Sequence, residues 1–234
     1  MMENVIFRFR GMFGIPVEIG QSIFGFVLIM FLLGASSGDP FQIVLFLVVI
    51  LGSIYLHEVG HAWGYRVQGL AVDRILLYGG GGLCFGAASA KPRQMELIVA
   101  MGPIVNLVLW AVAGIAQWAL FSFAMSGGVS SQFMAEVVTF SFKVLAMIKV
   151  VNIWLFAFNM MPVQPLDGGR LFHLAMVRIL PPDAALRITG KVGLVFCFLW
   201  IPAMIALFVF AGWILFFFPS FKMHMAMSRG ERSY

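Results

Sequence analysis

Residues 41–65 read FQIVLFLVVILGSIYLHEVGHAWGY, and this stretch decides the fold. No charge interrupts it from Phe41 to Leu56, and the sequence His57-Glu58-Val59-Gly60-His61 follows in the same apolar run. An apolar run of about 20 residues is long enough to cross the hydrocarbon core of a bilayer as a helix. An acid at mid-helix costs roughly 2.5 to 3.5 kcal/mol to insert, and ionisable groups placed there are functional by default.

The two histidines and the acid suit a metal site. Residues four apart share one face of a helix, so His57 and His61 can bind one zinc ion, and Glu58 beside them can take a proton from water. His57 comes 16 residues after Phe41, which is about 24 Å along a helix. In a core of about 30 Å, the predicted metal lies below the membrane surface, nearer the cytoplasmic face.

Composition supports a membrane protein throughout the chain. The 234 residues are 62% hydrophobic and 11% charged, whereas soluble proteins carry about 25% charged residues. A net charge of +5 is too small to indicate a nucleic-acid partner. The two cysteines, Cys84 and Cys197, are too far apart for a C-x-x-C pair, and we expect free thiols.

The apolar segments predict a polytopic α-helical membrane protein with about six transmembrane helices. Four spans are expected at residues 21–34, 41–65, 95–123 and 139–161, with a polar loop at 126–136. Residues 192–219 form either one long span or two short spans that turn near Pro202. Basic residues at both ends of the chain favour two, because the positive-inside rule then places both termini in the cytoplasm. The first span also resembles a signal peptide, but the Gly and Pro residues before it favour a retained span.

Two segments differ from the spans and predict a small membrane-associated β-sheet. Residues 4–20 alternate apolar and polar side chains around Gly-Pro breaks, as short strands do. In the loop 66–93, Val72–Tyr78 and Leu83–Ala88 flank four glycines, Gly79 to Gly82, which indicates a hairpin. No separate soluble domain is expected, so residues 1–234 form one transmembrane domain.

A catalytic zinc ion needs a third protein ligand. Asp167 follows the fourth predicted span, after Pro162 and Pro165 break that helix, and Gly168-Gly169 allows close backbone approach. His173 is the rival ligand. Glu96 and Glu136 lie at span ends and are expected to be solvated, and Lys143 and Lys149 are expected to extend toward the membrane surface.

Together these motifs resemble the site-2 protease family of intramembrane zinc metalloproteases. The resemblance rests on His57-Glu58-x-x-His61 and on Asn159-x-x-Pro162-x-x-Pro165-Leu166-Asp167-Gly168. Three further stretches agree with the family: Phe13-Gly14-Ile15-Pro16, Gly79-Gly80 and Gly102-Pro103-Ile104-Val105-Asn106, although Met101 replaces the usual Ala. The PDZ and CBS domains of some members are absent from these residues.

The resemblance implies a metalloendopeptidase that cleaves membrane-spanning proteins or peptides within the lipid bilayer. It implies zinc on His57, His61 and Asp167, with Glu58 as general base and then general acid. Asn159 is expected either to bind the substrate backbone or the developing oxyanion, or only to join helices. For Asn106 and Asn152 we expect helix packing.

The sequence also supports expectations about how substrate is bound and about the membrane in which the protein lies. A substrate must be extended to be cut, and the hairpin around Gly79 and Gly80 offers strand edges for it, unless the hairpin is only structural. The expected location is the cell inner or plasma membrane, with the active site toward the cytoplasm. The alternative function is a zinc-binding membrane protein or carrier without protease activity, for which Glu58 would not be needed.

Overall fold

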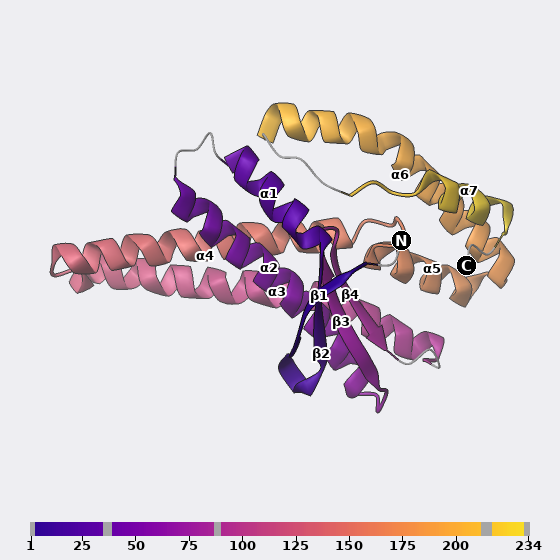
Figure 1. Ribbon diagram of the computed structural model, residues 1–234, viewed down its shortest axis with the longest axis horizontal. Helices are drawn as coiled ribbons and strands as arrows, with labels where there is room; N and C mark the ends of the chain where they lie inside the picture. The colour runs from indigo at the N-terminus through magenta and orange to yellow at the C-terminus, as the bar shows by residue number, and fades with distance from the viewer. Residues whose placement is uncertain (1–2, 35–38, 87–89, 212–216, 232–234) are drawn as a thin grey trace. The chain divides into compact units, whose positions relative to one another are not determined.

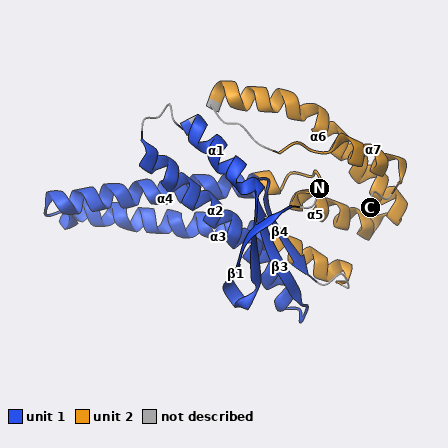
Figure 2. Cartoon of the chain, viewed as in Figure 1, with its two compact units in different colours: residues 1–88, 101–157 blue, residues 89–100, 158–234 orange. Residues whose placement is uncertain are grey.

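The computed structural model describes residues 3–34, 39–86, 90–211 and 217–231. The chain divides into two compact units, which are described in turn (Figure 2). The first comprises residues 1–88 and 101–157, and the second comprises residues 89–100 and 158–234.

Helices dominate the described residues, in which four short strands form one sheet (Figure 1). The elements are β1 (Val5–Arg10), η1 (Met12–Gly14), β2 (Pro16–Gly20), α1 (Ser22–Gly34), α2 (Pro40–Arg66), β3 (Val72–Tyr78), β4 (Gly81–Gly86), α3 (Pro92–Phe123), the π-helical η3 (Ala124–Gly128), α4 (Gln132–Asn159), α5 (Asp167–Ile179), α6 (Pro182–Ala211) and α7 (Phe221–Arg229).

Four helices among the described residues are long and apolar enough to cross a membrane, so the chain is a multi-pass membrane protein. They lie at Pro40–Arg66, Pro92–Gly128, Gln132–Asn159 and Pro182–Phe210. α1 occupies the first predicted span, but its 13 residues extend only about 20 Å, less than the core thickness of about 30 Å. α4 begins at Gln132, so the predicted polar loop at 126–136 is shorter than expected.

The predicted turn near Pro202 is wrong. α6 continues through Pro202 to Ala211, since a proline is tolerated inside membrane helices when other groups satisfy the freed backbone. The chain has nevertheless returned along α6 by residue 217. The indole N–H of Trp200 donates to the carbonyl of Phe217 over 2.8 Å, and these two rings also meet edge to face. The part of this predicted span at 212–216 lies outside the described residues.

The predicted strands in residues 4–20 and 66–93 are confirmed, and they form one sheet in the order β1-β2-β3-β4. β2 and β3 run parallel, and the other two pairs are antiparallel. The second hairpin strand starts at Gly81, which pairs with Tyr78, so the turn contains only Gly79 and Gly80. Its predicted end at Ala88 lies outside the described residues. β3 is an inner strand, so among the described strands the sheet edges belong to β1 and β4.

The sheet packs on α2 and thereby sets the rotation of that helix. Val17 and Ile75, paired in register, lie in one buried cluster with Val59 and Ala62 of α2. Val59 and Ala62 are three residues apart and therefore share a face. Since His57, Glu58 and His61 flank these two anchors, packing the sheet fixes where their side chains point.

In the second unit, α5, α6 and α7 pack together with the first turns of α3. The guanidinium of Arg178 on α5 binds both carboxylate oxygens of Glu96, with Nε donating to Oε1 over 2.7 Å. Glu96, which was expected to be solvated, is partly exposed and forms this ion pair, which links α5 to the start of α3. The rings of Phe158, Trp200 and Phe217 form a further cluster.

Candidate metal centre

His57 and His61 converge on the buried face of α2. The side chains are 5% and 8% exposed, and their Nε2 atoms lie 3.1 Å apart with the rings edge to face at 85°. Zinc binds imidazole nitrogen at about 2.0–2.1 Å, so two tetrahedral ligands of one ion place their nitrogens roughly 3.3 Å apart. The pair therefore fits the spacing that a shared zinc ion requires.

A chain of three buried polar side chains sets the tautomer of His57. The amide nitrogen of Asn152 donates to Ser53 Oγ over 3.0 Å, and its oxygen accepts from Asn106 Nδ2 over 2.8 Å. Asn106 must then present its oxygen to His57 Nδ1, 2.6 Å away. Because that oxygen can only accept, Nδ1 carries the proton and the lone pair of Nε2 is directed at His61.

Gly102 on α3 leaves room on the ligand side of the histidine pair. A Cβ at this position would lie 2.4 Å from His61 Nε2 and 2.7 Å from His57 Nε2. Any larger residue would occupy the place of a metal ion. Position 102 must therefore be glycine, because the backbone of α3 lies so close to the two histidines.

Glu58 is buried next to strand β4. It is 5% exposed, and a Cβ added at Gly82 would lie 2.4 Å from Glu58 Cγ. Burial first, and the charge of Glu58 second, raise the pKa of Cys84 on the same strand to about 12. The Cys84 thiol therefore stays protonated near neutral pH and is a poor nucleophile.

Asp167 belongs to the second unit and is the first residue of α5, where it is 6% exposed. The proline turn, residues 160–166, precedes it. A Cβ at Gly168 would lie 2.2 Å from the carbonyl oxygen of Met160, and one at Gly169 would lie 2.4 Å from the carbonyl carbon of Val163. The proline turn can lie this close to the first turn of α5 because both positions are glycines. This packing positions the carboxylate of Asp167 at the start of α5.

The model of Peptidase family M50 matches residues 45–200, about two thirds of the chain, and these residues include every candidate ligand. The chain belongs to Peptidase family M50. A zinc metalloprotease of Methanocaldococcus jannaschii is 25% identical over 190 residues, covering 81% of this chain and 51% of the relative. Stage IV sporulation protein FB of Bacillus subtilis is 28% identical over 198 residues, covering 82% and 61%.

A solved structure shares the fold of this family member. The site-2 protease from Methanocaldococcus jannaschii superposes with a TM-score of 0.59 at 18% identity, covering 96% of this chain and 92% of that one. The M50 chain spans only about half to three fifths of the length of the two curated relatives.

The structure also locates the remaining predicted site residues of the M50 chain. The Nδ1 atom of His173 lies 3.2 Å from Thr189 Oγ1. Burial lowers the pKa of His173. Asn159 is the last residue of α4 and is half-buried. In the hairpin turn, the Gly79 amide donates to Ser22 Oγ over 2.8 Å, which attaches the turn to the start of α1.

Asn106 and Gly82 contact the candidate site residues, although neither was predicted to do so from the sequence. Asn106 was assigned to helix packing, yet it orients His57. Its position in Gly-Pro-x-x-Asn was the available signal. Gly82 was assigned to the hairpin turn, yet it lies in a strand against Glu58. No sequence signal distinguishes a strand glycine from a turn glycine inside a run of four.

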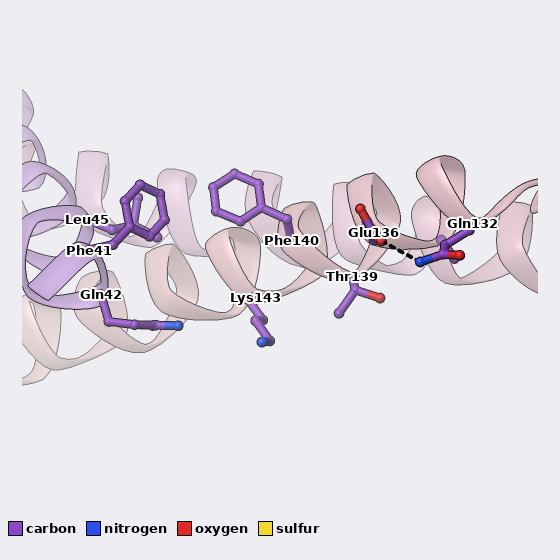
Figure 3. Close-up of a pocket in the computed structure, with 9 residues that line it drawn as sticks. Phe41, Gln42, Leu45, Gln132, Glu136, Thr139, Phe140 and Lys143 are labelled. Carbon is purple, nitrogen blue, oxygen red and sulfur yellow. Dashed lines mark hydrogen bonds between the residues drawn. The ribbon is translucent and has the colours of Figure 1, made fainter. Parts of the chain in front are cut away.

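A pocket between α2 and α4 lies away from this chemistry (Figure 3). Its α2 residues, such as Gln42, are 15 positions before His57, or about 22 Å along the helix. Its α4 residues include Lys143 and the hydrogen-bonded pair Gln132 and Glu136. It contains none of the predicted metal or catalytic residues.

Proposed function

We propose that this M50 family member is an intramembrane zinc metalloprotease that hydrolyses peptide bonds of membrane-embedded proteins. The observation that carries the proposal is the buried pair of histidines, with the Nε2 lone pair of His57 directed at His61 by Asn106 and with Glu58 adjacent on the same membrane helix. A zinc carrier needs no buried acid beside its ligands, whereas a hydrolase requires one as a base.

We propose His57, His61 and Asp167 as the zinc ligands. Catalytic zinc sites use three protein ligands and keep one position open, and a buried aspartate follows a turn that its neighbouring glycines make possible. When bound, zinc supplies a Lewis acid that polarises the scissile carbonyl and makes water more acidic.

The protein groups then move the proton. Glu58 accepts a proton from the attacking water and later donates it to the leaving amine, which restores the carboxylate. Its burial keeps competing bulk water away from this exchange. Asn159 is proposed to donate a hydrogen bond to the substrate backbone or to the oxyanion.

Substrate is proposed to pair as an extended strand with the edge of β4. An unwound segment there gains main-chain hydrogen bonds whatever its side chains are, and Gly82 brings this strand against Glu58. The turn Gly79-Gly80 supports the edge through its bond to Ser22. Substrates are membrane-spanning proteins or peptides, and the surrounding partner is the lipid bilayer.

For the whole chain, we propose one transmembrane domain over residues 1–234 with six membrane segments. α1 and the returning segment after α6 add to the four long helices. Both termini and the active site face the cytoplasm, and the membrane is the cell inner or plasma membrane.

The deciding experiment compares wild type with Glu58→Gln, both purified in detergent. Zinc content is measured on the same samples that are assayed for cleavage of co-expressed single-span proteins. Wild type should hold zinc and cleave, and the variant should keep zinc and lose at least about a hundredfold in rate, the scale of general acid–base catalysis. A zinc-loaded wild type whose cleavage does not need Glu58 would contradict the proposal.

A further inference from the structure

His224 on α7 is a buried histidine outside the matched family region of residues 45–200. Its side chain is 0% exposed. Nδ1 lies 2.8 Å from the carbonyl oxygen of Ser220, and because a carbonyl can only accept, Nδ1 carries the proton. Nε2 therefore has a lone pair, and it accepts the backbone N–H of Gln164 over 3.3 Å.

The fit of His224 depends on two glycines of α6. A Cβ at Gly193 would lie 1.8 Å from Cδ2 of the imidazole, and one at Gly190 would lie 2.3 Å from the backbone nitrogen of Ser228. α7 therefore lies directly on the backbone of α6. This close packing leaves the ring of His224 one position, with Nε2 toward the proline turn.

The bond from Gln164 connects α7 to the segment that presents Asp167. Within the proline turn, Val163 and Leu166 bond to the backbone of the turn itself, and Val163 is fully buried. Gln164 instead donates to a side chain 60 positions later. This hydrogen bond is part-buried. Backbone N–H groups shielded from water are nearly always paired, so losing the acceptor would favour a shift of the turn that lets the Gln164 N–H find another partner. Asp167 lies three residues after Gln164, so a shift of the turn would move its carboxylate.

We propose that His224 is a positioning residue, which holds the proline turn so that Asp167 keeps the orientation that zinc binding needs. The inference rests on the proposed function in one respect only, the role of Asp167 as a ligand. The C-terminal helix α7 then contributes to the metal centre without touching it.

The test compares His224→Leu and His224→Gln with wild type, in the full chain. Leucine fills the site but cannot accept, whereas the Oε1 atom of glutamine can. Hydrogen exchange of the Gln164 amide should accelerate about tenfold in His224→Leu, and zinc should be lost to a chelator about tenfold faster, on the scale of outer-shell changes at metal sites. His224→Gln should restore both toward wild type.

His173→Leu is the matched control, since His173 is another histidine that packs toward α6 but binds Thr189 rather than the turn. It should leave exchange at Gln164 unchanged. If His224→Leu accelerates exchange throughout α7 as much as at Gln164, or if glutamine rescues nothing, His224 only packs the helix and the proposal is wrong. A wild-type chain without zinc would contradict the proposed function, whereas the exchange measurement would still decide whether His224 holds the turn.

Discussion

Asp167 and His173 lie on the same short helix, yet their environments differ. Asp167 is buried at the start of α5, and His173 faces Thr189 on α6. We therefore predict that Asp167→Ala lowers zinc content to near zero, because two ligands rarely retain the ion, and that His173→Ala keeps it near the wild-type level. Metal analysis of the two purified variants checks this. Zinc loss in His173→Ala alone would make His173 the third ligand.

Asn106 offers a prediction about a residue that does not touch the metal. Asn106→Leu preserves volume but removes the acceptor that keeps the Nδ1 proton on His57. Removing such an outer-shell partner costs about 10- to 100-fold in metal affinity. Zinc competition titrations should show this loss, and Gln117→Leu is the control, because Gln117 binds Lys149 elsewhere on α3 and α4. Equal affinity in wild type and Asn106→Leu would contradict the orienting role.

The histidine pair and Glu58 were predictable from the sequence because helix geometry alone brings residues four apart together. Asn106 was not, because its partner His57 is 49 positions away and only the crossing of two helices brings them together. Lys149 shows the same limit. It was expected to extend toward the membrane surface, but it donates to Gln117 over 2.9 Å, in a part-buried hydrogen bond between α4 and α3.

At the scale of elements, β4 provides a test of substrate binding. We predict that Phe85→Pro impairs cleavage severalfold without zinc loss, because proline removes a backbone donor from β4, the strand on whose edge substrate is proposed to pair, and is tolerated in edge strands. Cleavage kinetics and zinc content of the folded variant check this. Helix-breaking substrates should be affected as strongly as stable ones, since both must pair with the edge.

The control for this prediction comes from the inner strand. Ile75 lies in β3 between β2 and β4 and is fully buried. Ile75→Pro should therefore lower the free energy of unfolding and disrupt the sheet as a whole, rather than act on substrate alone. A folded Phe85→Pro variant that cleaves every substrate at the wild-type rate would argue against substrate pairing with the β4 edge.

Strand positions were predictable because apolar and polar residues alternate between turn residues, and the predicted range Val72–Tyr78 matches β3. The order of the strands was not. β2 joins β3 in parallel although α1 and α2 separate them in sequence, and a local pattern contains no information on such a pairing. The continuation of α6 through Pro202 was missed for a related reason, since proline ends helices in water more strictly than in membranes.

At the scale of the whole molecule, three antiparallel returns, two in the first unit and one in the second, support the proposed six-segment topology. β2 precedes α1 and β3 follows α2, yet the two strands pair, so α1 and α2 together bring the chain back to its starting side. α3 and α4 also return together, since Asn106 binds Asn152 and Gln117 binds Lys149 in antiparallel order. At the last return, Gly230 at the end of α7 lies against Arg187 near the start of α6.

In the proposed six-segment topology both termini lie on one side of the membrane. The positive-inside rule favours the cytoplasm, since Arg8, Arg10, Lys222 and Arg229 are basic residues near the ends of the described chain. We predict that a fluorescent reporter fused after Tyr234 folds, because it stays in the cytoplasm, whereas a phosphatase that needs export is inactive there. The chain truncated at Gly128, between α3 and α4, should give the reverse pattern and is the matched control. An active phosphatase after Tyr234 would mean that the segment following α6 does not recross the membrane, and the six-segment proposal would then be wrong while the histidine pair on α2 would be unaffected.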